Sequence, residues 1–309
     1  MHLFLRSIGF SEFGANDEEK LVKTAIKSAI NSSSVILNKE LKRGIVLIRT
    51  SEKTGICIYG EYDGKKFKVE YYYPYLLGSA SSESEEITIE RHIDKESYAA
   101  VSEELKAGVT LIFYVQNVME YLDFMVPLMQ NNKSDYGTFN LFTRNLSEKI
   151  PFNGKSVVLS ALSVGGMILL PISKNQHQIK KYNDAANVRK NLLAAAKKGD
   201  EDAIESLTIE DLDTYTKLSK RIICEDVFTI VDSSFMPCGV ECDQYSVVGE
   251  IHDIITEVNS ITGETIYIMT LECNDMYFDV VINSFDLIGE PAIGRRFKGQ
   301  IWLQGAINF

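Results

Sequence analysis

Features that would mark a membrane or exported protein are missing from the sequence. No apolar run approaches the roughly 20 residues that a membrane-spanning helix needs. The first residues, Met1–Arg6, lack the basic leader and the apolar stretch of a secretory signal, so we expect a cytoplasmic protein with no membrane partner. The five cysteines in 309 residues are an odd number, which favours reduced thiols over a disulfide framework.

Motifs with an obvious catalytic role are also missing. The four histidines form no H-E-x-x-H pattern, and none lies next to a G-x-S-x-G serine. Gly154-Lys155-Ser156 copies the end of a phosphate-binding loop, but Lys149 stands where that loop needs its first glycine. A turn at Asn153-Gly154 explains this stretch better. The sequence therefore predicts no catalytic residue and no cofactor.

The most regular patterning lies at the C-terminal end of the chain. Tyr245–Val258 and Glu264–Cys273 are apolar-rich runs separated by turn residues, and Met276–Asn283 alternates apolar and polar residues at period two. Residues 297–304 alternate in the same way, and residues 306–309 supply a fifth short piece. Five short strands with a kinking glycine in the first predict an OB-like antiparallel β-barrel over residues 226–309. The side chains expected inside are Met269, Leu271, Cys273, Phe278, Val280, Phe297, Ile301 and Leu303.

Residues 1–173 predict a strand-rich domain of mixed type, which makes the expected fold class α+β. Asn16 is the predicted N-cap of a helix with an apolar stripe at helical spacing. Asp63-Gly64 predicts a tight hairpin, and Gly165-Gly166 predicts a second one. Two further expectations are an edge strand or an extended entry over residues 1–10 and a helix over Ser97–Lys106.

Residues 174–225 differ in composition and predict a helical connector. Gln178–Lys198 reads as one long helix ended by Gly199, and two shorter helices follow from Asp200 and Thr208. Residues 174–199 hold seven basic residues and one acidic residue, a net charge of +6. These lysines and arginines are spread around the helix, so a solvated face is favoured over a nucleic-acid or membrane surface.

The charge of the predicted barrel argues against nucleic acid as its partner. Residues 226–309 hold 13 acidic residues and only three basic ones, a net charge of −10. Barrels that bind single strands use a positive groove, because the phosphate backbone is negative. A nucleic-acid-binding OB-type protein is therefore an alternative and not the preferred interpretation.

Acidic and sulfur-containing residues suggest metal chemistry only weakly. Asp232 and the stretch from Glu241 to Asp253, with Asp243 and Glu250 inside it, form an acidic cluster, but its spacing matches no known metal-binding loop. A metal-dependent hydrolase or transferase using Glu241 to Asp253 is the second alternative. A zinc site would combine Cys238, Cys242, Cys273 and His252, yet only one short ligand spacing is present, so we predict no metal.

Trp302, the single tryptophan, is the strongest candidate for a contact residue. Alternation places it opposite Ile301 and Leu303, where a large indole needs cover from another part of the chain or from a partner. Together with the nearby cations Arg295, Arg296 and Lys298, Trp302 defines a candidate interaction surface.

Three stretches of sequence resemble a known bacterial family. They are Met1–Phe10, Gly199–Thr208 and Gly239–Tyr245, and the closing Gly294–Gly305 extends the similarity to the end of the chain. The chain resembles domain-of-unknown-function family 3881, found in clostridia and their relatives. This resemblance implies a cytoplasmic bacterial protein and carries over no activity. The preferred interpretation is a non-enzymatic binding or protein-interaction module, with a protein, a small ligand or a second copy of the chain as partner.

Overall fold

The computed structural model describes residues 2–38, 42–79, 81–83, 86–91, 98–102, 110–117, 120, 151–153, 156–172, 192, 195, 200–209, 232–239, 243–274 and 276–308. The chain forms two compact units, one of residues 1–169 and 233–309 and one of residues 170–232. Strands dominate the first unit and helices are few, so the predicted α+β class is confirmed. The three-part division at residues 173 and 225 stays a prediction.

The chain begins with a short 3-10 helix, η1 (Leu3–Ile8), where we expected an edge strand or an extended entry. Leu5 and Ile8 are one helical turn apart and both are fully buried, which a helix achieves and a strand with period-two alternation would not. Gly9 ends η1 with a positive φ of 92°, and its N–H donates to the carbonyl oxygen of Arg6. The prediction of an edge strand at the N-terminus was therefore wrong.

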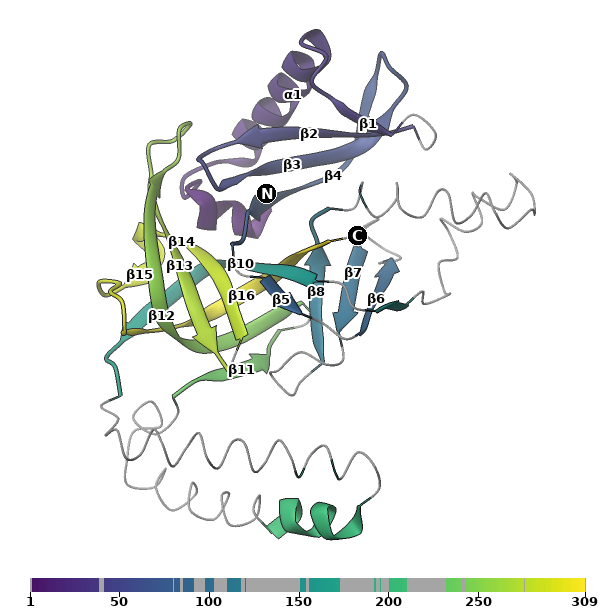
Figure 1. The fold of residues 1–309 in the computed structure, drawn as a ribbon. Coiled ribbons are helices and arrows are strands. Elements are labelled where there is room, and N and C mark those ends of the chain that lie inside the picture. Colours follow the sequence, from purple (N-terminus) through teal and green to yellow (C-terminus); the bar gives the residue numbers. More distant parts are fainter. Residues whose placement is uncertain are drawn as a thin grey trace, which may run out of the picture. The chain divides into compact units, whose positions relative to one another are not determined.

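Helix α1 (Ala15–Asn31) and a four-stranded antiparallel sheet follow η1 (Figure 1). The N-cap is Gly14 instead of the predicted Asn16, because the side chain of Asp17 accepts a hydrogen bond from the Gly14 backbone at 3.3 Å. The strands lie in chain order: β1 (Ile36–Asn38), β2 (Arg43–Arg49), β3 (Thr54–Tyr62) and β4 (Phe67–Leu76).

The tight turn between β3 and β4 confirms the hairpin predicted at Asp63-Gly64. Gly64 has a φ of 89°, a value that favours glycine. The carboxylate of Asp63 accepts hydrogen bonds from the backbone N–H groups of Lys65 and Lys66, which fixes the turn.

The second sheet contains twelve strands. Those that precede the C-terminal region are β5 (Ser81–Glu83), β6 (Glu86–Arg91), β7 (Tyr98–Ser102), β8 (Leu111–Val115), β9 (Pro151–Asn153) and β10 (Ser156–Leu169). Strand β7 pairs with both β6 and β8, so the helix predicted over Ser97–Lys106 was wrong for residues 98–102. Pairing with two neighbours there outweighs the local helical pattern.

The C-terminal region adds β11 (Ser234–Pro237), β12 (Gln244–Val258), β13 (Thr265–Cys273), β14 (Met276–Asn283), the 3-10 helix η2 (Ser284–Asp286), β15 (Leu287–Ile288) and β16 (Arg296–Ile307). Five strands close a barrel in the order β12, β13, β14, β10, β16 and back to β12. The predicted OB-like barrel is therefore present. Its β10–β14 pairing is parallel, whereas the other four are antiparallel as predicted.

The fifth barrel strand comes from an unexpected part of the chain. We expected residues 306–309 to supply it, but β16 continues through Ile307, and β10 takes the place between β14 and β16. In an OB barrel the parallel pair joins the third and the last strand. Strands β12, β13, β14 and β16 thus occupy the first four OB positions. Strand β10 occupies the fifth position, although it precedes the other four strands in the sequence. The order of the barrel strands along the chain is therefore a circular permutation of the OB order.

A single strand runs through Gly165-Gly166, where we predicted a hairpin. Strand β10 pairs with β16 on both sides of these glycines, with a register shift between Ser163 and Gly166. The Ser163 hydroxyl donates to the carbonyl oxygens of Gly165 and Gln300, which holds the shifted backbone in place. Val164 and Gly165 therefore form a β-bulge opposite Gln300, Gly166 pairs with Gly299, and the prediction of a hairpin was wrong.

All eight side chains predicted inside the barrel are buried: Met269, Leu271, Cys273, Phe278, Val280, Phe297, Ile301 and Leu303. In the second unit, residues 201–209 are helical, and the Asp200 carboxylate accepts from the Ala203 N–H at 3.2 Å, which confirms the predicted cap. The predicted helix over 178–198, most of the one from Thr208 and the Gly154-Lys155 turn lie outside the described residues. Within the described part of the chain, no helix is both long and apolar enough to cross a membrane.

Candidate functional site

Trp302 is covered by other parts of the same chain. Its ring stacks on Phe4 at a centroid distance of 5.2 Å and contacts His2 and Tyr114 at 5.2 and 5.1 Å. Its Nε1–H donates a 2.7 Å hydrogen bond to Asp243, and only 6% of the residue is exposed. The expectation that another part of the chain packs over this indole is confirmed.

The cations grouped with Trp302 do not form one exposed surface. Arg296 is buried, whereas Arg295 and Lys298 are half-buried. The Arg295 guanidinium donates to the carbonyl oxygen of Glu290. A partner contact through Trp302, Arg295, Arg296 and Lys298 stays a prediction.

The acidic residues proposed as a metal or acid–base site do not converge. Asp243 binds the Trp302 indole, Glu250 lies across from Glu272, and Asp253 lies across from Thr270. Glu241 and Cys242 fall outside the described residues. Among the residues that the structure does describe, no three or more His, Cys, Asp or Glu side chains are arranged to hold a metal ion.

Two of the zinc ligands considered from the sequence, Cys273 and His252, are separated by the barrel wall. Cys273 lies on the inner face of β13, and its thiol donates to the carbonyl oxygens of Ser234 and Val248. Glu272 is the neighbour of Cys273 on β13, so its side chain points to the outer face, because side chains alternate along a strand. His252 contacts Glu272 and therefore lies on the outer face as well. Burial raises the pKa of the Cys273 thiol to about 12, so this cysteine is a protonated core residue at neutral pH.

The outer face of β13 and β14 is the most informative surface of the barrel. These strands take the second and third OB positions, whose outer face binds ligands in OB barrels. The outward-facing residue pairs, taken in order along the strands, are Ile266 with Asn283, Ile268 with Val281, Thr270 with Asp279, and Glu272 with Tyr277. The first three pairs are covered by the chain itself, whereas Glu272 and Tyr277 of the fourth pair are 34% and 41% exposed.

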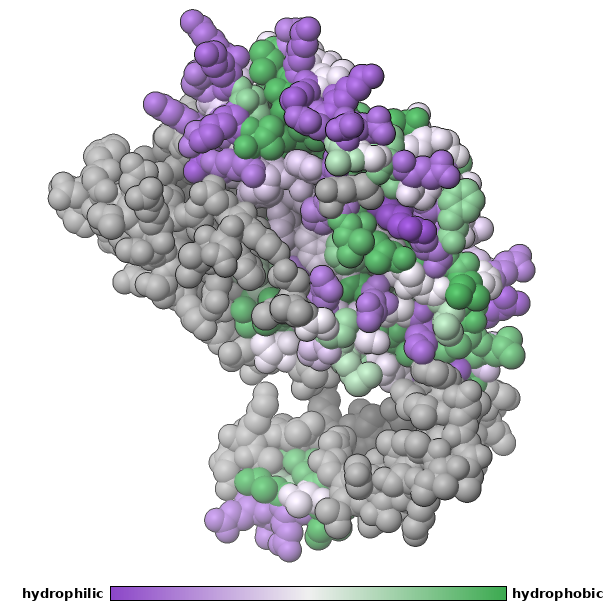
Figure 2. All heavy atoms as spheres, turned by 180° about the vertical axis from the view of Figure 1, so that it is seen from behind, coloured by the Kyte–Doolittle hydropathy of each residue, from purple (hydrophilic) through white to green (hydrophobic). Residues whose placement is uncertain are grey.

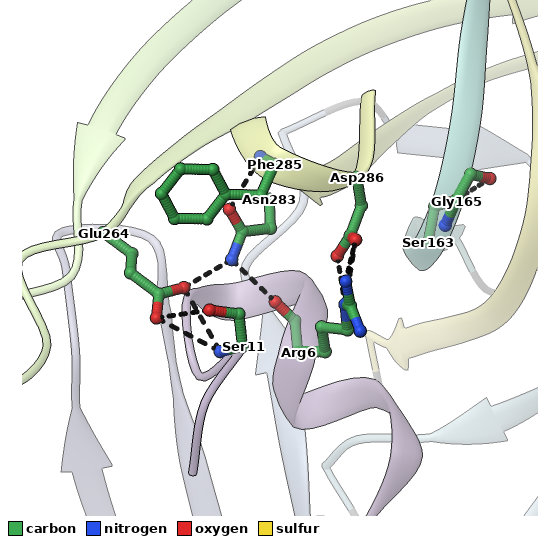
Figure 3. Close-up of polar contacts among 8 residues, drawn as sticks. All are labelled: Arg6, Ser11, Ser163, Gly165, Glu264, Asn283, Phe285 and Asp286. Atoms are coloured by element: carbon green, nitrogen blue, oxygen red, sulfur yellow. Dashed lines mark hydrogen bonds and ion pairs between the residues drawn. The ribbon is translucent and has the colours of Figure 1, made fainter. Parts of the chain in front are cut away.

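Residues 6–11 cover one end of this face, which we call the closed end (Figure 3). Arg6 Nε donates to both carboxylate oxygens of Asp286 at 2.8 and 2.7 Å, and this interaction raises the pKa of Arg6. The Ser11 backbone and hydroxyl both donate to Glu264, and Asn283 donates to Glu264 and to the Arg6 carbonyl oxygen. The N-terminal segment is thereby fixed to the end of the barrel.

Ser79 covers the middle of the face. Its backbone N–H and its hydroxyl donate to one oxygen of Asp279 at 2.7 and 2.6 Å, and Thr270 donates to the other oxygen at 2.6 Å. Asp279 is fully buried, and these three donors are what make a buried carboxylate tolerable.

The opposite end, which we call the open end, carries His252, Glu272 and Tyr277. His252 Nε2 lies 2.6 Å from a Glu272 carboxylate oxygen, with 39% and 34% of the two side chains exposed. The Tyr277 ring meets the imidazole edge to face at 5.4 Å. Ile251 pairs with Leu271 and Asp253 with Thr270, so His252 is the additional residue of a β-bulge, a feature that redirects a side chain.

Sequence reasoning missed both ends of this face. Glu272 and Tyr277 flank the predicted turn at Asn274 symmetrically, and hairpin pairing alone would have placed them opposite each other. The bulge at His252 has no signal in the sequence, because isoleucines surround it on both faces. The closed end depends on contacts between residues more than 250 positions apart, such as Ser11 with Glu264, which local patterning does not report.

The open end has the groups of a recognition surface. An exposed imidazole, carboxylates and an aromatic ring offer hydrogen-bond donors, acceptors and an apolar face in one place. Searches among curated proteins and among solved structures each found no match to the chain. The profile of one family, "Domain of unknown function, E. rectale Gene description (DUF3881)", matches residues 5–305, and the chain therefore belongs to this family.

Proposed function

We propose that the protein is a cytoplasmic, non-enzymatic binding module whose ligand is a protein segment or a small molecule. The observation that carries this proposal is the exposed group of His252, Glu272 and Tyr277 on the outer face of the barrel. The rest of that face is already covered by the chain, so the open end is where the fold offers its usual ligand surface to a partner.

The length of the uncovered face limits the kind of ligand. Glu272, Tyr277 and the adjoining His252 on β12 are partly exposed at this end of the face, whereas Ser79 and residues 6–11 lie over the rest of it. Two residues along a strand span roughly 7 Å. A single side chain or a small molecule fits this length, whereas an extended polymer lying along the face would collide with the region around Ser79.

A loop with exposed apolar side chains supports a role in protein interaction. Phe285, Ile288 and Ile293 lie between β14 and β16 and are 72%, 70% and 69% exposed. Figure 2, which views the molecule from behind, shows apolar side chains at the surface on the side where β15 lies. Exposed apolar groups of this size on one loop are typical of contact surfaces.

Binding arrays test the proposal directly. The purified full chain would be applied to arrays of peptides, oligosaccharides and oligonucleotides, beside the variant His252→Ala/Tyr277→Ala and the control Thr256→Ala. Thr256 is exposed on the same strand but lies outside the group. We expect peptide or saccharide signals that the double variant loses and Thr256→Ala retains. Signals that both variants retain would show that the open end is not the binding site.

Metal analysis separates the binding module from the metal-dependent enzyme. Protein purified from its native cell would be analysed for zinc, manganese and magnesium. A stoichiometric metal that persists in His252→Ala, and is lost on substitution of the acidic residues Glu241, Asp243, Glu250 or Asp253, would favour the hydrolase or transferase. We expect no stoichiometric metal.

A further inference from the structure

We infer that the closed end of the barrel is a peptide-binding site that residues 6–11 of the same chain occupy. This site is separate from the open end and does not depend on the function proposed above. It is formed by the loop between β12 and β13 and by the region following β14, with Asn259, Thr262, Glu264, Asn283 and Asp286 as its contact residues.

The barrel recognises the main chain of the segment. Asn259 Nδ2 donates to the carbonyl oxygen of Ile8 at 2.7 Å, and Thr262 Oγ1 donates to that of Gly9 at 2.6 Å. The Ser11 N–H donates in the other direction, to Glu264. Side chains that satisfy successive backbone groups of a segment are a means of peptide recognition, and here they act on the end of η1 and on the turn at Gly9, in addition to the apolar packing of Ile8.

Hydrogen bonds within the barrel region, which do not involve the segment, orient the contact side chains. Asn259 Oδ1 accepts from the backbone N–H groups of Ile261 and Thr262, which orients its amide so that the NH2 group faces residues 8 and 9. Asn283 Oδ1 accepts from the Phe285 N–H in the same manner. Both asparagines are fully buried, and without the segment each NH2 group would lose a carbonyl partner.

Three positions of the segment give the site its specificity. Arg6 pairs with Asp286, and the Ser11 hydroxyl donates to Glu264 at 2.8 Å. Gly9 has a φ of 92°, and a Cβ there would lie 2.9 Å from the Cβ of Asn259. The site therefore selects a peptide with the spacing Arg-x-x-Gly-x-Ser, in which only glycine fits the fourth position.

Competition in trans tests this inference on the full chain. Arg6→Ala/Ser11→Ala weakens the resident segment and leaves the barrel residues intact. A fluorescent peptide with the sequence of residues 2–13 would be titrated against this variant and against the wild type by anisotropy. We expect at least tenfold tighter binding to the variant. Adding Glu264→Gln/Asp286→Asn to the same chain should remove that binding, and a peptide with Gly9→Ala should bind at least tenfold more weakly.

Equal binding of a scrambled peptide, or no saturable binding to the folded variant, would overturn the inference. Hydrogen exchange on the wild type decides the matter if the variant does not fold. We then expect the amides of residues 4–11 to exchange at least tenfold faster than those of Leu271 and Val280, because the segment opens by itself. Exchange of all these amides at one common rate would show that the segment is an inseparable part of the core.

Discussion

The indole N–H of Trp302 lies 2.7 Å from a carboxylate oxygen of Asp243 and donates a hydrogen bond to it. This bond joins β16 to the start of β12, while Phe4 and Tyr114 cover the ring. The single tryptophan is thus a probe of the contact between the barrel and the N-terminal part of the chain. We expect a blue-shifted emission maximum and weak acrylamide quenching in dilute, monomeric protein.

Removing the acceptor of this bond should cost stability. Asp243→Ala leaves the buried Nε1–H without its partner, and we expect a loss of about 1–3 kcal/mol in the free energy of unfolding, measured in urea. Asp253→Ala is the matched control, because it removes the same charge from an exposed position on β12. Equal effects of the two substitutions would mean that the indole bond contributes nothing.

Asp279 should be among the most sensitive polar positions of the barrel. Asp279→Ala leaves three donors, two from Ser79 and one from Thr270, without their acceptor. We expect a loss of about 3 kcal/mol or more from unsatisfied buried groups, against about 1 kcal/mol for Ser79→Ala, which removes one bond. Urea unfolding of both variants tests this order, and a smaller effect for Asp279→Ala than for Ser79→Ala would contradict it.

Two adjacent glycines on β10 should respond differently to alanine. A Cβ on Gly166 would lie 2.3 Å from the ring of Phe297, whereas a Cβ on Gly165 meets no atom within 4 Å. We expect Gly166→Ala to cost about 1–3 kcal/mol through overpacking. Gly165→Ala should change stability by less than about 1 kcal/mol. Thermal unfolding of the two variants would refute this account of the bulge if their midpoints fell by the same amount.

Stability should fall in alkaline solution. Burial raises the pKa of the Cys57 and Cys273 thiols from 9.0 to about 12. Above pH 9 the unfolded chain releases these protons and the folded chain keeps them, so the free energy of unfolding decreases as the pH rises from 9 to 12. Each thiol contributes at most about 1.4 kcal/mol per pH unit. Urea unfolding at pH 8, 9 and 10.5 measures the slope.

The control for the alkaline experiment is Cys57→Ala/Cys273→Ala. Its absolute stability is lower because two buried side chains are truncated, but its dependence on pH should be shallower than that of the wild type. An unchanged slope would assign the alkaline loss to other groups. The tyrosines Tyr73 and Tyr114, whose pKa values burial also raises, would then be the next positions to substitute.

The barrel should not bind single-stranded nucleic acid. Its outer face carries Glu250, Asp253 and Glu272 at the open end, and the segment of residues 6–11 fills the closed end. A phosphate backbone would meet like charge and a covered surface. Fluorescence anisotropy with labelled DNA and RNA oligomers at physiological salt should show no binding, and a micromolar or tighter complex would contradict this prediction.

How far the sequence predicted the structure depends on how local each signal is. The alternation in β13 and β14 and the Asp63-Gly64 turn involve neighbouring residues, and each was identified correctly. Strand β10 is recruited by β14, more than 100 positions away, so its place in the barrel has no local signal. Residues 98–102 likewise become a strand through pairing with β6 and β8, against their own helical pattern.

The candidate site was predicted less well than the fold. The burial of Trp302 by another part of the chain was anticipated, because this large apolar side chain occupies a position that alternation assigns to the outer face of the strand. The group of His252, Glu272 and Tyr277 depends on a bulge, and the closed end depends on a helix that was expected to be extended. Both are products of tertiary packing, which period-two and helical patterns do not encode.

The place of β10 in the barrel affects how the chain folds as the ribosome makes it. Strand β10 leaves the ribosome well before its barrel partners β14 and β16. The β1–β4 sheet can fold on the nascent chain, because its strands are consecutive. The barrel closes only after β14 and β16 have been made, so the long apolar β10 waits without those two partners in the meantime. Chaperone depletion should therefore reduce soluble protein more than it reduces a fragment of residues 1–79.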